Sequence, residues 1–367
     1  AIIQPPVYLL GLIANIINII IYLKLKLKDS ITMCFFVLSC SDLMCVLLLI
    51  VEDAAMMFKE ILWERYQVDG KGLCWLMAFY YGSFYDISQG ITTFIAVQKC
   101  WCVALPFRFK NTFTTRRTTV ILTAISLMFF TLYIPIFASQ GLPGEFDPAT
   151  NKTLFKLWTS ENRGVIFSAV GLVALVFTTT CQFTVIFCVI ILASSLRASS
   201  KFRTSTTISS IEQISELKSK STKCDNKRSK KFGIPDKMNL KNREPDSNEE
   251  IAETTQSDVI TTRDADIKSA ARPVKTTSSK ELQAIKSTTF VAVLFVSCNT
   301  FKLLNYYVIL CIPDYSLYGV YENTYLMTNT FRILAESLHV SCNMFVYLTF
   351  NTRFRSTLLS MFGVGLK

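Results

Sequence analysis

The sequence has little of what metal sites and catalytic sites need. It contains a single histidine, His339, and its 12 cysteines include no matched CxxC pairs, so a zinc or haem site is not expected. No nucleophile, base and acid occur together in a motif, which argues against an enzyme. Internal repeats and paired spans interrupted by glycine or proline are also absent, which argues against a transporter.

What the sequence does contain is long apolar runs, since apolar residues make up 51% of its 367 positions. A helix needs about 20 such residues to cross a bilayer. Seven runs of this kind occur, at residues 7–23, 31–51, 73–105, 118–138, 165–196, 287–312 and 325–350. They are too long, and alternate too little, for a membrane β-barrel. The sequence therefore predicts an all-α membrane protein, a bundle of seven transmembrane helices.

One segment differs from these runs. Residues 198–280 are rich in Ser, Thr, Lys and Glu and nearly free of aromatic side chains. Such a composition cannot bury a core, so we expect a long disordered loop that interrupts a membrane domain at residues 1–350. Residues 351–367 follow that domain as a separate tail. Because the chain begins with Ala1 rather than Met, we expect part of its N-terminus to be missing.

The net charge of +11 is unevenly placed. Basic residues gather in alternate loops, at Lys24, Lys26, Lys28, Arg108, Lys110, Arg116, Arg117, Arg353 and Arg355. Since Lys and Arg accumulate on the cytoplasmic side, the N-terminus is expected outside the plasma membrane and the C-terminus inside. The divided charge fits a lipid surface better than a nucleic acid. Asn151 begins a glycosylation sequon in an outer loop, between the fourth and fifth runs.

Several apolar runs carry polar and ionisable side chains. In the seventh run, Arg332, Glu336, His339, Asn343 and Tyr347 follow at intervals of three or four, which places them on one helical face. Lipid offers them no partners, so the face is expected to point into the bundle. The other runs contribute Tyr81, Tyr85, Ser88, Thr92, Lys99, Asn15, Asp42 and Lys302 to the same polar seam.

Three points stay open within this seam. Arg332 and Glu336 could simply pair with each other, since they are four residues apart. His339 could be a neutral side chain bonded to a backbone carbonyl. Asp86, in the third run, could be a lone buried acid.

Several short patterns resemble the rhodopsin-like (class A) G-protein-coupled receptors. In chain order they are GLIANIINI (11–19, with Asn15), LSCSDL (38–43, with Asp42), IAVQKCWCVALPFRFK (95–110), NMFVY (343–347) and FNTRFRSTL (350–358). Together they cover nearly the whole chain apart from the long inner loop. The last pattern resembles the short amphipathic cytoplasmic helix that follows the seventh span in that family. KDSI, FDPATNKT and CNTFK resemble, more narrowly, molluscan chemosensory or neuropeptide-like orphan receptors.

The resemblance implies a receptor that senses an extracellular chemosensory cue or neuropeptide and signals to a heterotrimeric G protein. Ligand-binding candidates are Tyr81, Tyr85, Lys302 and Glu336, helped by the second outer loop. Lys302 beside Glu336 could recognise an anionic or zwitterionic ligand; alternatively, the two form an internal pair. The rival hypothesis is a seven-helix receptor or scaffold that binds without signalling.

The resemblance also implies a switch at the inner side of the bundle. Gln98 and Lys99 stand where the family has an acid and an arginine, and Glu281 lies at the foot of the sixth span. We expect a resting contact between Lys99 and Glu281, with Asn343 and Tyr347 as the switch residues of the seventh span. Asp42, Ser88 and Asn343 match the positions that hold a sodium ion in many members, and Asn15 and His339 complete this polar core.

The chain departs from the family pattern in prolines and in one disulfide. Phe301 and Met344 replace prolines of the sixth and seventh spans, so the hinges there are expected to be weaker or differently placed. Cys74 matches the family's helix-three cysteine, but the second outer loop has no cysteine to pair with it. Cys311 is expected to be too far away for a bridge.

Overall fold

The computed structural model describes residues 3–228, 279–312, 314–315 and 319–363, and the side chains of 198–285 are not among those described. The chain divides into two compact units, one formed by Ala1–Ala198 with Ser278–Lys367 and one by Ser199–Thr277. The first unit contains the helical bundle.

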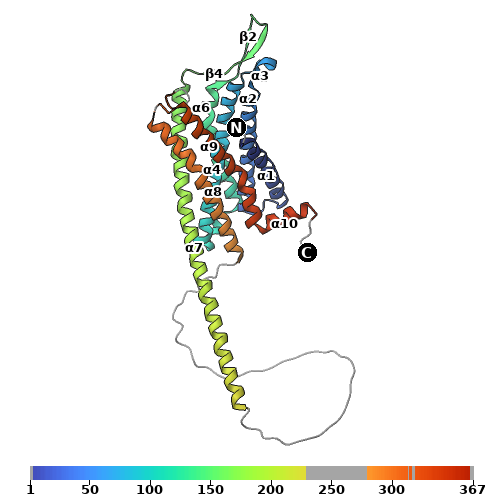
Figure 1. The fold of residues 1–367 in the computed structure, drawn as a ribbon, viewed down its shortest axis with the longest axis vertical. Helices are drawn as coiled ribbons and strands as arrows, with labels where there is room; N and C mark the ends of the chain where they lie inside the picture. Colours follow the sequence, from blue (N-terminus) through green and yellow to red (C-terminus); the bar gives the residue numbers. More distant parts are fainter. Residues whose placement is uncertain (1–2, 229–278, 313, 316–318, 364–367) are drawn as a thin grey trace. The chain divides into compact units, whose positions relative to one another are not determined.

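Seven of the described helices are longer than 20 residues. They are α1 (Gln4–Lys24), α2 (Ser30–Met57), α4 (Gly70–Ala104), α6 (Thr115–Ala138), α7 (Arg163–Arg228), α8 (Ser279–Cys311) and α9 (Glu322–Phe350) (Figure 1). Two short helices, α3 (Lys59–Tyr66) and α5 (Pro106–Thr112), lie between long ones, and a third, α10 (Thr352–Met361), follows α9. Disorder was expected for residues 198–280, but helix α7 continues into that segment as far as Arg228. Residues 229–278 lie outside the described residues.

Five of these helices are long and apolar enough to cross a membrane by length and composition, or six if the bent pair α9 and α10 counts as one span. The five are α1, α2, α6, the 163–195 part of α7 and the 289–311 part of α8. The helix at the third predicted span, α4, is not among them, because it carries Asp86, Lys71 and Lys99 together with many polar and glycine residues.

Local sequence explains where several helices begin. The side chains of Asp29, Thr114 and Asn351 each accept a hydrogen bond from a backbone N–H three residues further on, which caps the first turns of α2, α6 and α10. Asp69 likewise accepts from the backbone N–H of Lys71 at the start of α4. Pro5 lies in the first turn of α1, where no intrahelical N–H is lost.

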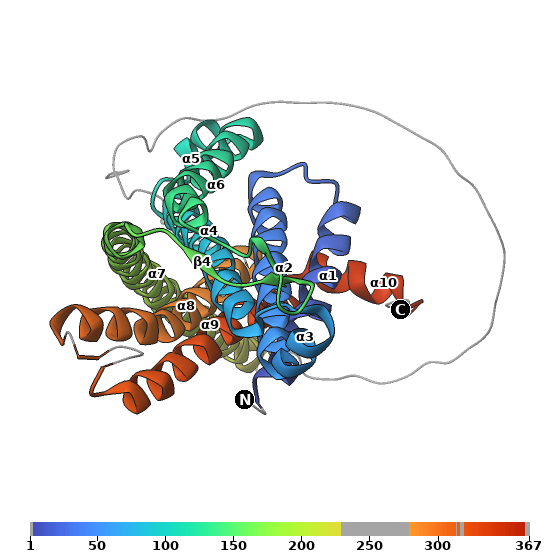
Figure 2. The same ribbon diagram turned by 90° about the horizontal axis from the view of Figure 1, so that it is seen from above.

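The helices pack around α4, which contacts α2, α6 and α8 and lies among them when the bundle is viewed along its axis (Figure 2). The outer faces are apolar. On α7, Phe183, Phe187 and Ile190 are more than half exposed, whereas Val185 and Leu192 on the opposite face are fully buried. A water-soluble helix has the reverse arrangement, so this face is suited to lipid.

An aromatic cluster joins α10 to the bundle. Tyr22 of α1, Phe35 of α2, Tyr347 of α9 and Phe354 of α10 are buried, with ring centroids 4.7 to 5.9 Å apart in contacting pairs. A helix therefore occurs where the sequence predicts a short one after the last span, and Phe354 anchors it.

The connection between α6 and α7 contains β-structure, which the all-α prediction did not include. Strands β1 (Gln140–Gly141) and β4 (Trp158–Thr159) pair antiparallel, and so do β2 (Gly144–Asp147) and β3 (Lys152–Phe155). We call the end of the bundle that carries these strands the hairpin end. In the β2–β3 turn, Asp147 accepts hydrogen bonds from Thr150 Oγ1 (2.8 Å) and the Ala149 N–H (3.0 Å), which hold the pKa of its carboxyl below the ordinary value.

The hairpin is tied to the segment between α3 and α4. The backbone N–H of Phe155 donates to the Gln67 carbonyl and the N–H of Asp69 donates to the Phe155 carbonyl, both at 2.8 Å. Gly72 allows the close approach, because a Cβ at that position would lie 2.7 Å from Cβ of Leu157. We call this backbone link, between residues 67–69 and 155, the hairpin strap.

Candidate functional site

A salt bridge is buried in the middle of the bundle. Lys302 Nζ of α8 lies 2.5 Å from Asp86 Oδ1 of α4, and the Tyr133 hydroxyl of α6 donates to Asp86 Oδ2 at 2.7 Å. Asp86 is 0% exposed and Lys302 2% exposed. Both carboxylate oxygens are thus satisfied, as a buried charge requires. The three side chains connect α4, α6 and α8.

Aromatic rings surround the ammonium group of Lys302. Its nitrogen lies 4.7 Å from the ring centroid of Tyr85 and 5.7 Å from that of Tyr306. Both distances are in the range of cation–π attraction, which is strongest where water is excluded. Lys302 therefore has one ionic partner and two aromatic ones.

A second ion pair lies on α9. Arg332 Nη1 donates to Glu336 Oε1 at 2.7 Å, Nη2 donates to the Tyr81 hydroxyl at 2.9 Å, and Nε donates to Asn329 Oδ1 at 3.0 Å. Glu336 and Tyr81 are fully buried. The guanidinium thus uses its planar fork to hold α9 against α4.

These pairings correct the expectation that Lys302 and Glu336 lie side by side as partners. Lys302 pairs with Asp86, and Glu336 pairs with Arg332. Asp86 is accordingly not a lone buried acid. The i, i+4 spacing of Arg332 and Glu336 already suggested that they pair with each other. Lys302 and Asp86 then remain as opposite charges that each need a partner. This charge balance was the signal in the sequence that pointed to the Asp86–Lys302 pair, and sequence reasoning missed it.

His339 of α9 lies between the rings of Tyr85 and Phe295. Its ring centroid is 6.0 Å from that of Tyr85 and 5.4 Å from that of Phe295. Neither imidazole nitrogen bonds to a backbone carbonyl or to any other described group, and the Tyr85 hydroxyl and Glu336 Oε2 also lack a described partner. These buried atoms keep the capacity for a further hydrogen bond.

The predicted polar core comes together around Asp42 of α2. The Ser88 hydroxyl donates to Asp42 Oδ1 at 2.5 Å, and Asn343 Nδ2 donates to Asp42 Oδ2 at 2.8 Å. Asn15 joins α1 to α9 by donating to the Val340 carbonyl at 3.0 Å. A carboxylate, a hydroxyl and an amide are ligands that suit a hard cation, and Asn343 Oδ1 has no described partner. The residues therefore fit the sodium hypothesis in kind, with oxygens of Asp42, Ser88 and Asn343 as the ligands that it requires.

A chain of uncharged side chains joins α4, α7 and α8 one turn below the Asp86–Lys302 pair. Gln89 Nε2 donates to Asn299 Oδ1, and the Thr178 hydroxyl donates to Gln89 Oε1 at 3.2 Å. Asn299 Nδ2 donates to Gln182 Oε1 at 3.1 Å, and Gln182 Nε2 donates to the Val296 carbonyl at 3.1 Å. We call these four side chains the amide network. Sequence reasoning missed all four, because single polar residues in apolar runs do not reveal their partners.

At the other end of α4, Gln98 has lost the charge that the family pattern expects and serves as a neutral link. The Cys34 thiol donates to Gln98 Oε1 at 3.4 Å, and Gln98 Nε2 donates to Thr118 Oγ1 at 3.3 Å. Lys99 is half-buried and forms no salt bridge with any side chain that the structure describes. The side chain of Glu281, its expected partner, lies outside the described residues.

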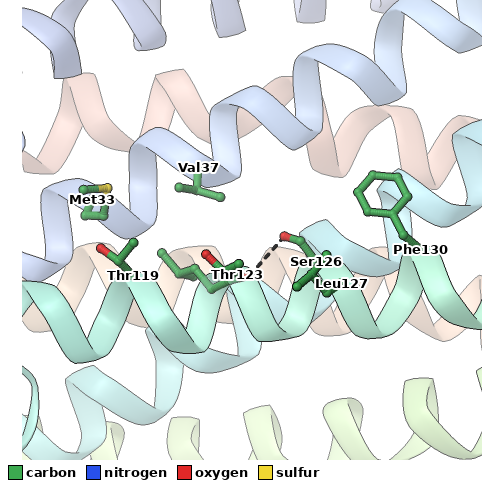
Figure 3. A pocket seen from close by; sticks show the side chains of 8 residues that line it. Met33, Val37, Thr119, Thr123, Ser126, Leu127 and Phe130 are labelled. Atoms are coloured by element: carbon green, nitrogen blue, oxygen red, sulfur yellow. Dashed lines mark hydrogen bonds between the residues drawn. The ribbon is translucent and has the colours of Figure 1, made fainter.

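A separate apolar groove of about 200 Å³ lies between α2 and α6 (Figure 3). It is lined by Met33, Val37, Thr119, Leu122, Thr123, Ser126, Leu127 and Phe130. The Ser126 hydroxyl donates to the Leu122 carbonyl of its own helix at 3.0 Å. None of the predicted ligand-binding residues lines this groove, so it is distinct from the polar seam.

Two predicted positions lie at the hairpin end. Asn151 is exposed in the β2–β3 turn, with a φ of 53°, so the sequon is accessible. Cys74 is a free thiol whose sulfur lies 3.9 Å from Glu52 Oε1. Among the described residues, the hairpin is thus tied to the start of α4 by the backbone hydrogen bonds of the hairpin strap and not by a disulfide from Cys74.

The chain matches the model of a known family. The family described as serpentine type 7TM GPCR chemoreceptor Srx matches residues 6–221, more than half of the chain. The matched region includes α1 to α6, the strands and most of α7, and so contains Asp42, Tyr85 and Asp86. No curated protein matches the chain.

The amide network generates a prediction about stability. Gln89→Ala is expected to lower the free energy of unfolding by about 1–2 kcal/mol, because it leaves the Asn299 and Thr178 polar atoms without their partner. The measurement is the thermal unfolding midpoint of the purified protein. The matched control is Thr180→Ala on α7, whose exposed hydroxyl donates to the Val176 carbonyl of its own helix. An equal shift in both variants would show that the network does not hold the helices together.

Proposed function

Because the chain belongs to the serpentine type 7TM GPCR chemoreceptor family Srx, we propose that it detects an extracellular chemical ligand and signals to a heterotrimeric G protein. The chain is a multi-pass membrane protein of a receptor family, and that family is not one of enzymes. The signalling step, the rhodopsin-like class and the molluscan relationship are parts of the proposal. They are supported by the sequence patterns that resemble rhodopsin-like and molluscan receptors.

One observation carries the proposal for the ligand site. Two ion pairs, Asp86–Lys302 and Arg332–Glu336, are buried in helices whose outer faces suit lipid. Charges in such surroundings are costly and mark a ligand or transport site. With Tyr81 and Tyr85 they form a compact polar centre that a ligand entering from the hairpin end reaches first.

The size of the ligand follows from the burial of this centre. Tyr81, Tyr85, Lys302 and Glu336 are each no more than 2% exposed, so a bound ligand contacts them only where it displaces protein groups. A small chemosensory molecule is therefore proposed in preference to a neuropeptide, which would need a wider opening.

The coupling step is proposed at the opposite end of the bundle. Ligand binding changes the balance between two arrangements of the helices, by as much as its affinity for the two differs. Gln98, Lys99 and Glu281 at this end, and Asn343 and Tyr347 on α9, are the proposed switch residues. The competing proposal is a receptor that binds without signalling, which the loss of the usual acid and arginine at Gln98 and Lys99 favours.

The receptor proposal is tested by expression with a full N-terminus in cells that report signalling through a promiscuous G protein. A panel of small odorants and peptides is expected to include an agonist. Lys302→Met is expected to raise the half-effective concentration at least about tenfold by removing a buried cation from the site. Lys71→Met, at an exposed lysine of α4, serves as the control. Normal surface expression with no response to any ligand would favour the non-signalling receptor.

The same assay examines the switch. Glu281→Ala is expected to raise basal signalling if it removes a resting contact with Lys99, and unchanged basal signalling and agonist potency would exclude a regulatory contact.

Sodium is expected to lower agonist affinity through Asp42 and Ser88, with an equal concentration of choline chloride as the control. Agonist affinity that does not respond to sodium would count against the cation site.

The proposed orientation places the hairpin end outside the plasma membrane, where Asn151 can be glycosylated. Enzymatic removal of N-linked glycans is expected to lower the apparent mass of the protein from eukaryotic cells. Asn151→Gln is expected to abolish that change, whereas Asn111→Gln, near the other end, leaves it in place. A mass that does not change in the wild-type protein would remove this support for the orientation.

A further inference from the structure

The polar centre is closed, and its charges are matched within the protein. Asp86 has partners for both carboxylate oxygens, in Lys302 and Tyr133. Arg332 donates to three side chains, Glu336, Tyr81 and Asn329. A charged ligand can enter such a centre only by taking the place of an internal partner, since each charge is already compensated.

Of the two partners in the Asp86–Lys302 pair, Lys302 is the nearer to the hairpin end along its own helix. At about 1.5 Å per residue, Lys302 lies about 14 Å from the end of α8 at Cys311, whereas Asp86 lies about 24 Å from the start of α4 at Gly70. Lys302 Nζ and Asp86 Oδ1 therefore meet well inside the bundle, more than two helical turns from the hairpin-end terminus of either helix.

Lys302 is also the partner that can change its contacts. Its ammonium has three donors on a flexible stem of four carbons, and one of them is used by Asp86. Asp86 has a short side chain and is held from its other side by Tyr133. When the pair separates, Lys302 can turn toward a new acceptor, while Asp86 stays in place with its remaining hydrogen bond.

The surroundings of Lys302 suit an organic anion. The rings of Tyr85 and Tyr306 face the ammonium, and flat aromatic walls accept the apolar part of a small molecule. The Tyr85 hydroxyl and the nitrogens of His339 have no described partner, so they add hydrogen-bonding capacity beside the cation. Lys302, Tyr85 and His339 are buried and Tyr306 is half-buried, which makes a charge-assisted bond there stronger than at the surface.

We infer that the ligand carries a carboxylate group, which binds Lys302 in place of Asp86, so that Asp86 acts as a built-in competitor for the ligand. The inference rests on the proposed receptor function and names the ligand class for that site. The competitor sets the threshold of the receptor, because part of the binding energy is used to separate Asp86 from Lys302. Separation also removes the direct ionic link between α4 and α8.

The inference can be tested by binding alone, without any signalling. The full chain is purified in lipid nanodiscs, and its thermal unfolding midpoint is measured against the concentration of three probes of matched shape: benzoate, benzamide and benzylamine. Benzoate is expected to raise the midpoint of the wild-type protein, and the neutral and cationic probes are not. Lys302→Met is expected to abolish the benzoate effect, and Lys71→Met to preserve it.

Asp86→Asn provides the sharper arm, since it removes the competing charge and keeps the shape of the side chain. The half-effective benzoate concentration is expected to fall at least about tenfold below that of the wild-type protein. If this variant fails to fold, the comparison of wild type with Lys302→Met still decides, because the inference requires benzoate binding that depends on Lys302. The double variant, Asp86→Asn with Lys302→Met, is then expected to fold, and benzoate is expected to leave its thermal unfolding midpoint unchanged.

Three other outcomes overturn the inference. Benzoate that acts equally on wild type and Lys302→Met does not bind the cation. Benzylamine that stabilises the protein through Asp86 would make the acid the anchor and an amine the ligand. A signal evoked only by neutral ligands, with no benzoate binding, would end the inference and leave the receptor function intact. Benzoate binding that depends on Lys302, with no signal in any assay, would keep the inference about the ligand and count against the proposed signalling function.

Discussion

The structure depends on the cost of an unpaired charge inside a membrane. Four of the charged side chains in the middle of the bundle are Asp86, Lys302, Arg332 and Glu336, and each is compensated by an opposite charge within 2.7 Å. Because lipid cannot provide that compensation, the pairs determine which helix faces turn inward and which helices are neighbours. Asp86 joins α4 to α6 and α8 through Tyr133 and Lys302, and Arg332 joins α9 to α4 through Tyr81.

The charged pairs and the amide network divide the same interface into two kinds of contact. The salt bridge and the amide network both connect α4 with α8, about one turn apart. An ionic contact can be exchanged for another ion, because a ligand can bring the charge that it replaces. A chain of amides such as Gln89, Asn299 and Gln182 offers no comparable exchange. The interface between α4 and α8 therefore contains an ionic contact and, about one turn away, an uncharged amide contact.

Much of the architecture could be predicted from apolar runs, because the energetics of crossing a bilayer depend on length and composition alone. The charges on α4 and α9 explain why composition identifies five or six spans and not seven. The inward face of α9 followed from the spacing of Arg332, Glu336 and His339, which is a property of one helix. The pairing of Lys302 with Asp86 did not follow, because it depends on the rotation and depth of two helices that are 216 residues apart in sequence. The hairpin was missed for a related reason: its strands are two to four residues long, and their hydrogen bonds to the segment between α3 and α4 carry no sequence signature.

The hairpin strap and a disulfide would respond differently to the redox conditions around the hairpin end. A disulfide depends on an oxidising compartment and opens only when a thiol attacks it. The strap consists of two backbone hydrogen bonds between residues 67–69 and 155, each worth about 1 kcal/mol. It therefore forms regardless of redox conditions, and it opens and closes thermally as a local unfolding event. The attachment of the hairpin to residues 67–69 therefore responds to temperature and backbone fluctuation, with no disulfide from Cys74 to break.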